Sequence, residues 1–99
     1  MIKHVVFMKF KKESRPEDIE FMEKELGALP GIIPEIKYYD LGKDVLHSER
    51  SYDFALVSAF DNLESMQRYI NHPQHQQAAK KSRELSESIV VVDFESGAE

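Results

Sequence analysis

Apolar and polar residues alternate along residues 2–11, and this period of two predicts a β-strand. One face of the predicted strand carries Ile2, His4, Val6, Met8 and Phe10. The other face carries Lys3, Val5, Phe7, Lys9 and Lys11, so it is apolar in its middle and charged at its ends. Both faces of the strand therefore contain apolar side chains.

A helical pattern follows the strand. Ser14 and Glu17 have the spacing of a capping box, and Pro16 falls in the first turn, where its missing N–H costs nothing. Apolar residues then recur at helical spacing and predict a stripe that faces the core: Ile19, Met22, Leu26 and Leu29. Pro30 and Gly31 are expected to end this helix.

Two strands are predicted in the middle of the chain. The second strand is expected over residues 35–45, with Gly42 at a bulge or a bend. A polar connection over residues 46–51 leads to a third strand at residues 52–60. The third strand places Phe54, Leu56 and Phe60 on one face, and Ala55, Val57 and Ala59 on the other.

A second helix is expected to begin at an acidic cap, Asp61, followed by Glu64 three residues later. Its predicted buried stripe consists of Leu63, Met66, Tyr69 and Ile70. Pro73 is expected to break the helix, which then resumes over residues 74–84. Residues 89–94 form the last predicted strand, and residues 96–99 are expected to be a frayed tail of a single domain that spans residues 1–99.

The resulting order, β-α-β-β-α-β, predicts a ferredoxin-like α+β fold: an antiparallel sheet with both helices on one face. The face opposite the helices would carry Val5, Phe7, Ala55, Val57 and one of the two interleaved sets within residues 89–92. A monomer rarely leaves an apolar patch of that size in water. We therefore expect a homodimer in which the sheet of a second copy covers this face.

The composition narrows the classes of protein that remain. The chain has no cysteine, which excludes disulfides, thiolate nucleophiles and cysteine-ligated metals and suits a reducing compartment. The net charge of −5 disfavours nucleic acid or an anionic membrane as the main partner. The first residues lack the zones of a signal peptide, and no apolar run has the length of a membrane span, so we expect a cytoplasmic protein.

Histidines are the main candidates for chemistry, because only this side chain titrates near neutral pH without help. His4 is the polar exception on an apolar strand face, where it is either a hydrogen-bonded core residue or part of a site. His72 or Asn71 is expected to cap the helical piece after Pro73. His75 falls in the first turn of that piece, where the helix dipole keeps the ring neutral, as a general base requires.

The alternatives for this segment remain open at the level of sequence. Tyr69 lies either in core packing or with its hydroxyl at the edge of a cavity, and His75 is either a surface residue or a base. A metal site made of His4, His72 and His75 is disfavoured, because no pair has HExxH spacing and no carboxylate lies at a matching spacing. Lys80 and Lys81 are interpreted as a solvated pair.

The chain resembles the stress-responsive dimeric A/B barrel (Dabb) family over nearly its whole length. The resemblance rests on residues 4–10, 29–34 and 42–44, on Tyr52-Asp53, on residues 91–94 and above all on the Tyr69-Ile70-Asn71-His72-Pro73-Gln74-His75 segment. It implies a ferredoxin-like fold and a dimer whose two sheets close into a barrel.

The resemblance also implies candidate functional residues. Some plant members are polyketide cyclases that close a linear poly-β-ketone by aldol condensation without a cofactor or a metal. In these members the positions of Tyr69 and His75 carry the reaction, and the position of His4 lines the same pocket. The enzyme hypothesis predicts a closed cavity of roughly a few hundred Å³ under the helices, lined by apolar neighbours such as Phe21, Met22 and Leu26 and able to take a hydrophobic small molecule.

Two other functions compete with a cyclase or lyase-type enzyme. One is a non-catalytic stress or assembly protein, for which the dimer is the functional object. The other is a monooxygenase-like relative, since other ferredoxin-like dimers of this size oxidise quinols or haem.

Overall fold

The computed structural model describes residues 1–97 of the 99-residue chain. Its elements are β1 (Ile2–Phe10), α1 (Pro16–Gly27), a 3-10 turn (Leu29–Gly31), β2 (Tyr38–Lys43), β3 (Phe54–Phe60), α2 (Leu63–Asn71), α3 (Pro73–Leu85) and β4 (Ser86–Glu95). Within residues 1–97, no helix combines the length and the apolar character needed to cross a bilayer.

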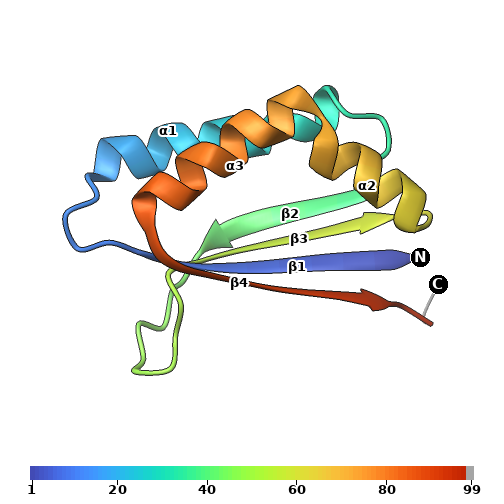
Figure 1. Cartoon of the computed structure of the whole chain (residues 1–99). Coiled ribbons are helices and arrows are strands. Elements are labelled where there is room, and N and C mark those ends of the chain that lie inside the picture. Colours follow the sequence, from blue (N-terminus) through green and yellow to red (C-terminus); the bar gives the residue numbers. More distant parts are fainter. Residues whose placement is uncertain (98–99) are drawn as a thin grey trace.

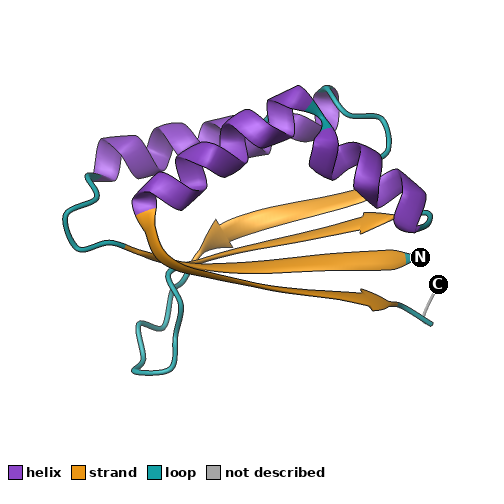
Figure 2. Cartoon of the chain, in the orientation of Figure 1, coloured by secondary structure: helices purple, strands orange, loops and turns teal. Residues whose placement is uncertain are grey.

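The four strands form one sheet in the order β2-β3-β1-β4, and every neighbouring pair is antiparallel. All three α-helices lie on the same face of this sheet, and the opposite face is bare (Figures 1 and 2). The ferredoxin-like α+β fold expected from the sequence is confirmed. The connection between β2 and β3 projects away from the helices, past the bare face of the sheet (Figure 1).

The hydrophobic core lies between the helices and the sheet. Alternate residues of β1 and β3 point into it, among them Val6, Met8, Phe54 and Leu56. The helices cover them with Met22, Leu26, Met66, Tyr69 and Ala78. Of the stripe expected on the first helix, Ile19 is only partly buried, because it lies near the helix start.

The bare face of the sheet is apolar, as the two-sided strand pattern predicts. In the strand register, Val5 lies between Val57 and Val92, and Phe7 lies between Ala55 and Val90. Phe7 remains 42% exposed and Val92 remains 62% exposed. The structure also decides between the two interleaved sets of the last strand: Ile89, Val91 and Asp93 pair with inward-facing residues of β1, so Val90, Val92 and Phe94 face outward.

Several predicted features of the first half of the chain differ from the structure. Ser14 does not cap α1; its hydroxyl donates to the Leu85 carbonyl at 2.8 Å, which ties the start of α1 to the end of α3, and Arg15 is the N-cap. The second strand is shorter than predicted at both ends and spans Tyr38–Lys43, while Glu35 lies before it and pairs with Arg68 of α2 at 2.9 Å. The register is regular through Gly42, so the sheet has no bulge there.

The second half differs at the start of α2. The N-cap is Asn62 rather than Asp61, and its Oδ1 accepts from the Ser65 N–H at 2.9 Å. Leu63 is 57% exposed instead of buried, because it is the first helical residue after the turn from β3. The predicted tail extends into residues 98–99, which lie outside the described residues. Within the described part, the Ser96 N–H donates to the Met1 carbonyl at 2.8 Å.

Candidate active site

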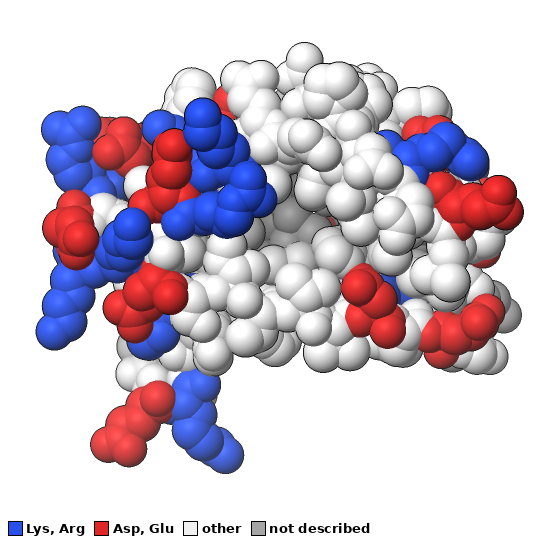
Figure 3. Space-filling view, in the orientation of Figure 1, with Lys and Arg blue, Asp and Glu red and all other residues white. Residues whose placement is uncertain are grey.

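A cavity of about 390 Å³ lies between the helices and the β1–β4 side of the sheet. Its apolar wall is formed by Val6, Met8, Leu26, Leu56, Ile70, Ala79, Ile89 and Val91, and its polar lining by His4, Tyr69, His75, Ser82, Arg83 and Asp93. The cavity is open to solvent rather than closed, and Figure 3 shows the molecule hollowed between the helices and the front strands. All three residues expected at the site contribute to the same cavity.

The apolar lining differs in part from the expected one. Leu26 lines the cavity as predicted. Met22 is fully buried in the core and does not reach the cavity. Phe21 is 54% exposed on the outer side of α1, where the Lys81 ammonium lies 5.8 Å from the centre of its ring.

His4 reaches the cavity from β1 and is only 7% exposed. Its Nδ1 is bonded to Oδ1 of Asp93, the residue directly opposite it on β4. The His4 ring also meets the edge of the Tyr69 ring, with 6.1 Å between the centroids. Both interpretations of His4 therefore apply. Its ring is a buried, hydrogen-bonded core residue, and it also lines the cavity.

Tyr69 comes from α2 and is 1% exposed. Its ring packs between Phe60, at 4.8 Å between centroids, and His75, at 4.3 Å. Burial raises the pKa of Tyr69 to about 12, and the neighbouring Tyr39 hydroxyl opposes this shift. The Tyr69 hydroxyl is therefore protonated at physiological pH and is available as a hydrogen-bond donor.

Tyr39 of β2 is a neighbour of Tyr69 outside the cavity lining. Burial raises the pKa of Tyr39 above its ordinary value, and the nearby Tyr69 acts in the same direction. Its hydroxyl is buried and has no hydrogen-bond partner of regular geometry among residues 1–97. Tyr69 lines the cavity and Tyr39 does not, although the two hydroxyls lie close to each other.

His75 is placed by the helix break at Pro73, which puts it in the first turn of α3. Its Nδ1 lies 3.0 Å from the Ile70 carbonyl oxygen at the end of α2. A carbonyl can only accept, so we assign the proton to Nδ1, which leaves a lone pair on Nε2 when the ring is neutral. Burial lowers the pKa of His75, the Ile70 carbonyl opposes this shift, and the positive charges of His4, Arg83 and His72 lower it further.

His72 has the structural role expected of it. It is the N-cap of α3, and its Nδ1 accepts from the Gln74 N–H at 3.1 Å. Among residues 1–97, no group of three or more His, Cys, Asp or Glu side chains is arranged to hold a metal ion.

Two polar residues of the cavity were missed from the sequence: Asp93 and Arg83. Asp93 shares a strand face with Ile89 and Val91, but the sequence left open which of the two faces of this strand points inward. Nothing in the helical pattern distinguishes Arg83 from the other charged residues of α3.

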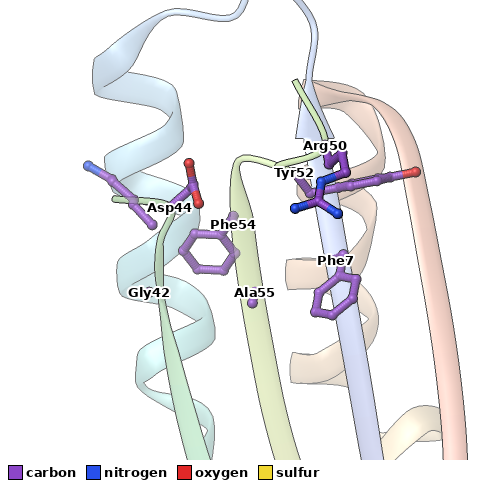
Figure 4. Close-up of a pocket in the computed structure, with 8 residues that line it drawn as sticks. Phe7, Gly42, Asp44, Arg50, Tyr52, Phe54 and Ala55 are labelled. Carbon is purple, nitrogen blue, oxygen red and sulfur yellow. The ribbon is translucent and has the colours of Figure 1, made fainter. Parts of the chain in front are cut away.

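A second hollow, of about 310 Å³, lies on the bare side of the sheet near the β2–β3 connection. Its lining includes Phe7, Asp44, Arg50 and Tyr52, and Figure 4 shows the Tyr52 ring and the Arg50 guanidinium on the same side as Phe7. The Phe7 and Tyr52 rings are 6.2 Å apart. This hollow holds no histidine and no pair of facing titratable rings like Tyr69 and His75, so we place the candidate chemistry in the cavity under the helices.

Two curated relatives match almost the whole chain. Olivetolic acid cyclase of Cannabis sativa is 32% identical over 95 residues, covering 94% of this chain and 94% of the relative. The stress-response A/B barrel domain-containing protein HS1 of Arabidopsis thaliana is 32% identical over 97 residues, covering 94% and 87%.

Solved structures also match almost the whole chain. A dimeric ferredoxin-like protein of unknown function from Thermobifida fusca superposes with a TM-score of 0.86 at 30% identity, covering 94% of this chain and 88% of the other. A hydroxynitrile lyase from Passiflora edulis (TM-score 0.87, 22% identity, covering 99% and 94%) and an antibiotic biosynthesis monooxygenase (0.75, 16%, covering 97% and 98%) share the fold. The sequence profile of the stress-responsive A/B barrel domain matches residues 2–96. The chain therefore belongs to the stress-responsive A/B barrel domain family.

Proposed function

We propose that the cavity under the helices binds a hydrophobic small molecule and catalyses a cofactor-independent, aldol-type ring closure of a linear poly-β-ketone. The observation that carries the proposal is that a neutral imidazole with a free Nε2, a protonated phenol and a second histidine meet in one largely apolar cavity. The 32% identity to an olivetolic acid cyclase supports the choice of reaction.

The first step is a proton transfer from carbon. Nε2 of His75 removes a proton from a carbon between two carbonyls, and the ring becomes an imidazolium. The Tyr69 hydroxyl donates a hydrogen bond to the enolate oxygen on which the negative charge develops. The enolate carbon then attacks a second carbonyl carbon of the same chain, which forms the ring bond, and the new alkoxide takes a proton from the His75 imidazolium.

His4 has a supporting role in this proposal. The bond between its Nδ1 and Asp93 fixes the plane of the His4 ring, so its Nε2 edge can orient a ketone oxygen or relay a proton. The apolar wall of the cavity accepts the alkyl part of the substrate and shields that side of the enolate from water.

The experiment is turnover of a synthetic tetraketide thioester, in which C2 can attack the C7 carbonyl and close a six-membered ring. The products are followed by mass spectrometry. We expect His75→Ala and Tyr69→Phe each to lower kcat by about 100-fold or more, because a general base and an enolate donor each contribute effects of that order. His72→Asn is the matched control, since it changes a histidine of the same segment but retains a side-chain cap. Equal turnover by the wild type, His75→Ala and Tyr69→Phe would exclude the cyclase.

We further infer that the chain works as a cytoplasmic homodimer whose two sheets face each other and close into a barrel. The apolar bare face supports this arrangement, since Phe7, Val90, Val92 and Phe94 would otherwise remain in water. Relatives of the same fold are described as dimeric. If the wild type does not turn over the thioester, the dimer itself is the functional object, and the chain is a non-catalytic stress or assembly protein.

A further inference from the structure

The opening of the cavity is basic on one side. Arg83 of α3 lines the cavity and also a neighbouring groove of about 660 Å³ on the outside of the helices, where it is joined by Lys80, Gln76 and Gln77. His75 also borders both spaces, so the two hollows meet at His75 and Arg83. Figure 3 shows Lys and Arg side chains along one side of the central hollow.

The Arg83 guanidinium is free to bind a ligand. Its side chain forms no ion pair and no hydrogen bond within residues 1–97. The other charged group of the cavity, Asp93, is already bonded to His4. An anion that enters the cavity therefore meets an unpaired guanidinium, while the Asp93 carboxylate is held at the His4 ring.

We propose that the ligand of this cavity is an amphipathic carboxylic acid whose carboxylate is bound by Arg83 and whose apolar chain lies along Leu26, Ile89 and Val91. The inference rests on the proposed function only in taking this cavity as the ligand site. A single guanidinium matches a single carboxylate, because its planar fork donates two parallel N–H bonds to the two carboxylate oxygens. Lys80 adds a second positive charge in the adjoining groove.

Binding of such an acid should change the pKa of His75, the candidate base. His75 has positive neighbours in His4, Arg83 and His72, and its pKa is lowered in part by them. Asp93 and Lys80 are the other charged groups at the two hollows. A carboxylate on Arg83 offsets a permanent positive charge that lowers the pKa of His75, so this pKa should rise when an acid binds and should not rise when a neutral ligand binds.

The test compares octanoate with 1-octanol, which share an apolar chain but differ in charge, by titration calorimetry. We expect the wild type to bind octanoate about tenfold more tightly than octanol, the effect of one charge-assisted hydrogen-bonded pair at a partly open site. Arg83→Gln should remove this preference and leave the affinity for octanol unchanged, and Arg83→Lys should restore part of it. Lys81→Gln is the matched control, because it removes the same charge from α3 at a residue that lies over Phe21, outside the cavity.

The ring protons of His75, followed by NMR through a pH titration, provide an independent readout. Octanoate should raise the pKa of His75 in the wild type but not in Arg83→Gln. Equal affinities for the two ligands in the wild type, or the same preference in Arg83→Gln, would overturn the proposal, as would binding of neither. A clear preference for the acid without any turnover of the thioester would leave this inference standing and remove the cyclase.

Discussion

At the scale of single residues, the protonation state of His75 controls the proposed chemistry. The neutral ring is the base, and burial together with neighbouring positive charges lowers its pKa below the ordinary value of 6.5. The active form therefore persists as the pH falls through 6.5 and is lost only at a lower pH. We expect the acidic limb of the kcat/KM profile to lie below pH 6.5, and an acidic limb above pH 6.5 would contradict the assignment of His75 as a neutral base.

The same shift makes stability depend on pH. Between the lowered folded-state pKa of His75 and its unfolded value of 6.5, the unfolded chain binds a proton that the folded chain does not. Stability should therefore fall as the pH drops through this window and level off below it. Urea unfolding at a series of pH values should show a steeper fall for the wild type than for His75→Gln, which has no ring to protonate. Parallel curves would mean that His75 titrates in the folded protein as it does in the unfolded chain.

Tyr39 provides a second residue-scale prediction. Its hydroxyl is buried beside Tyr69 without a hydrogen-bond partner of regular geometry among residues 1–97, so folding removes it from water with little return. Tyr39→Phe should leave the free energy of unfolding unchanged or raise it slightly. The free energy of unfolding of Tyr69→Phe, which removes the other hydroxyl at the cavity wall, is measured for comparison. A loss of 2 kcal/mol or more, roughly the cost of stranding a buried partner, would instead establish a strong bond between the two hydroxyls.

At the scale of elements, the corner between α2 and α3 is what brings Tyr69 and His75 together. Pro73 starts α3 without an N–H to satisfy, and the His72 side chain caps the new helix. His72→Ala removes the cap and should cost about 1 kcal/mol, or roughly 4–8 °C in Tm, while His72→Asn should retain most of the stability. Thermal unfolding by circular dichroism measures both, and equal Tm values for the two variants would show that the cap contributes nothing.

The elements also show where sequence reasoning works and where it stops. The inward face of β1, the core side chains of α1 and the break at Pro73 were predictable, because local periodicity and local backbone chemistry determine them. The bounds of β2 were not, because they depend on the pairing of this strand with β3, a contact between separate segments. For the same reason Ser14 looked like a cap, although its hydroxyl bonds to Leu85, 71 residues away.

The candidate site follows the same division. His4, Tyr69 and His75 could be named from the strand parity, the helical stripe and the family resemblance. Asp93 was hidden because the run at residues 89–92 is apolar at every position and its inward face could not be chosen without the register with β1. The position of Arg83 at the cavity could not be predicted, because it depends on how α3 packs against the sheet.

At the scale of the whole molecule, the bare sheet face decides how the chain exists in solution. Val5, Val57 and Val92 lie side by side in the register at the middle of this face, and the connection between β2 and β3 projects past it with Val45 90% exposed and Leu46 75% exposed. A face-to-face pair of sheets would bury these residues and bring the projecting connection of each copy alongside the other. The hydrophobic gain then comes from association rather than from folding.

A charge on this face should therefore change assembly more than folding. Val92 is already 62% exposed in the single chain, so Val92→Asp should leave the monomer folded but oppose the approach of a second sheet. We expect analytical ultracentrifugation at micromolar concentration to give a dimer for the wild type, and a monomer or an aggregate for Val92→Asp and for Val57→Asp. Lys24→Asp on the outer surface of α1 and Tyr69→Phe in the cavity should both remain dimeric. A stable monomeric wild type would refute the dimer. It would also mean that the apolar face of the sheet stays exposed to water, an unfavourable exposure that folding of a single chain does not remove.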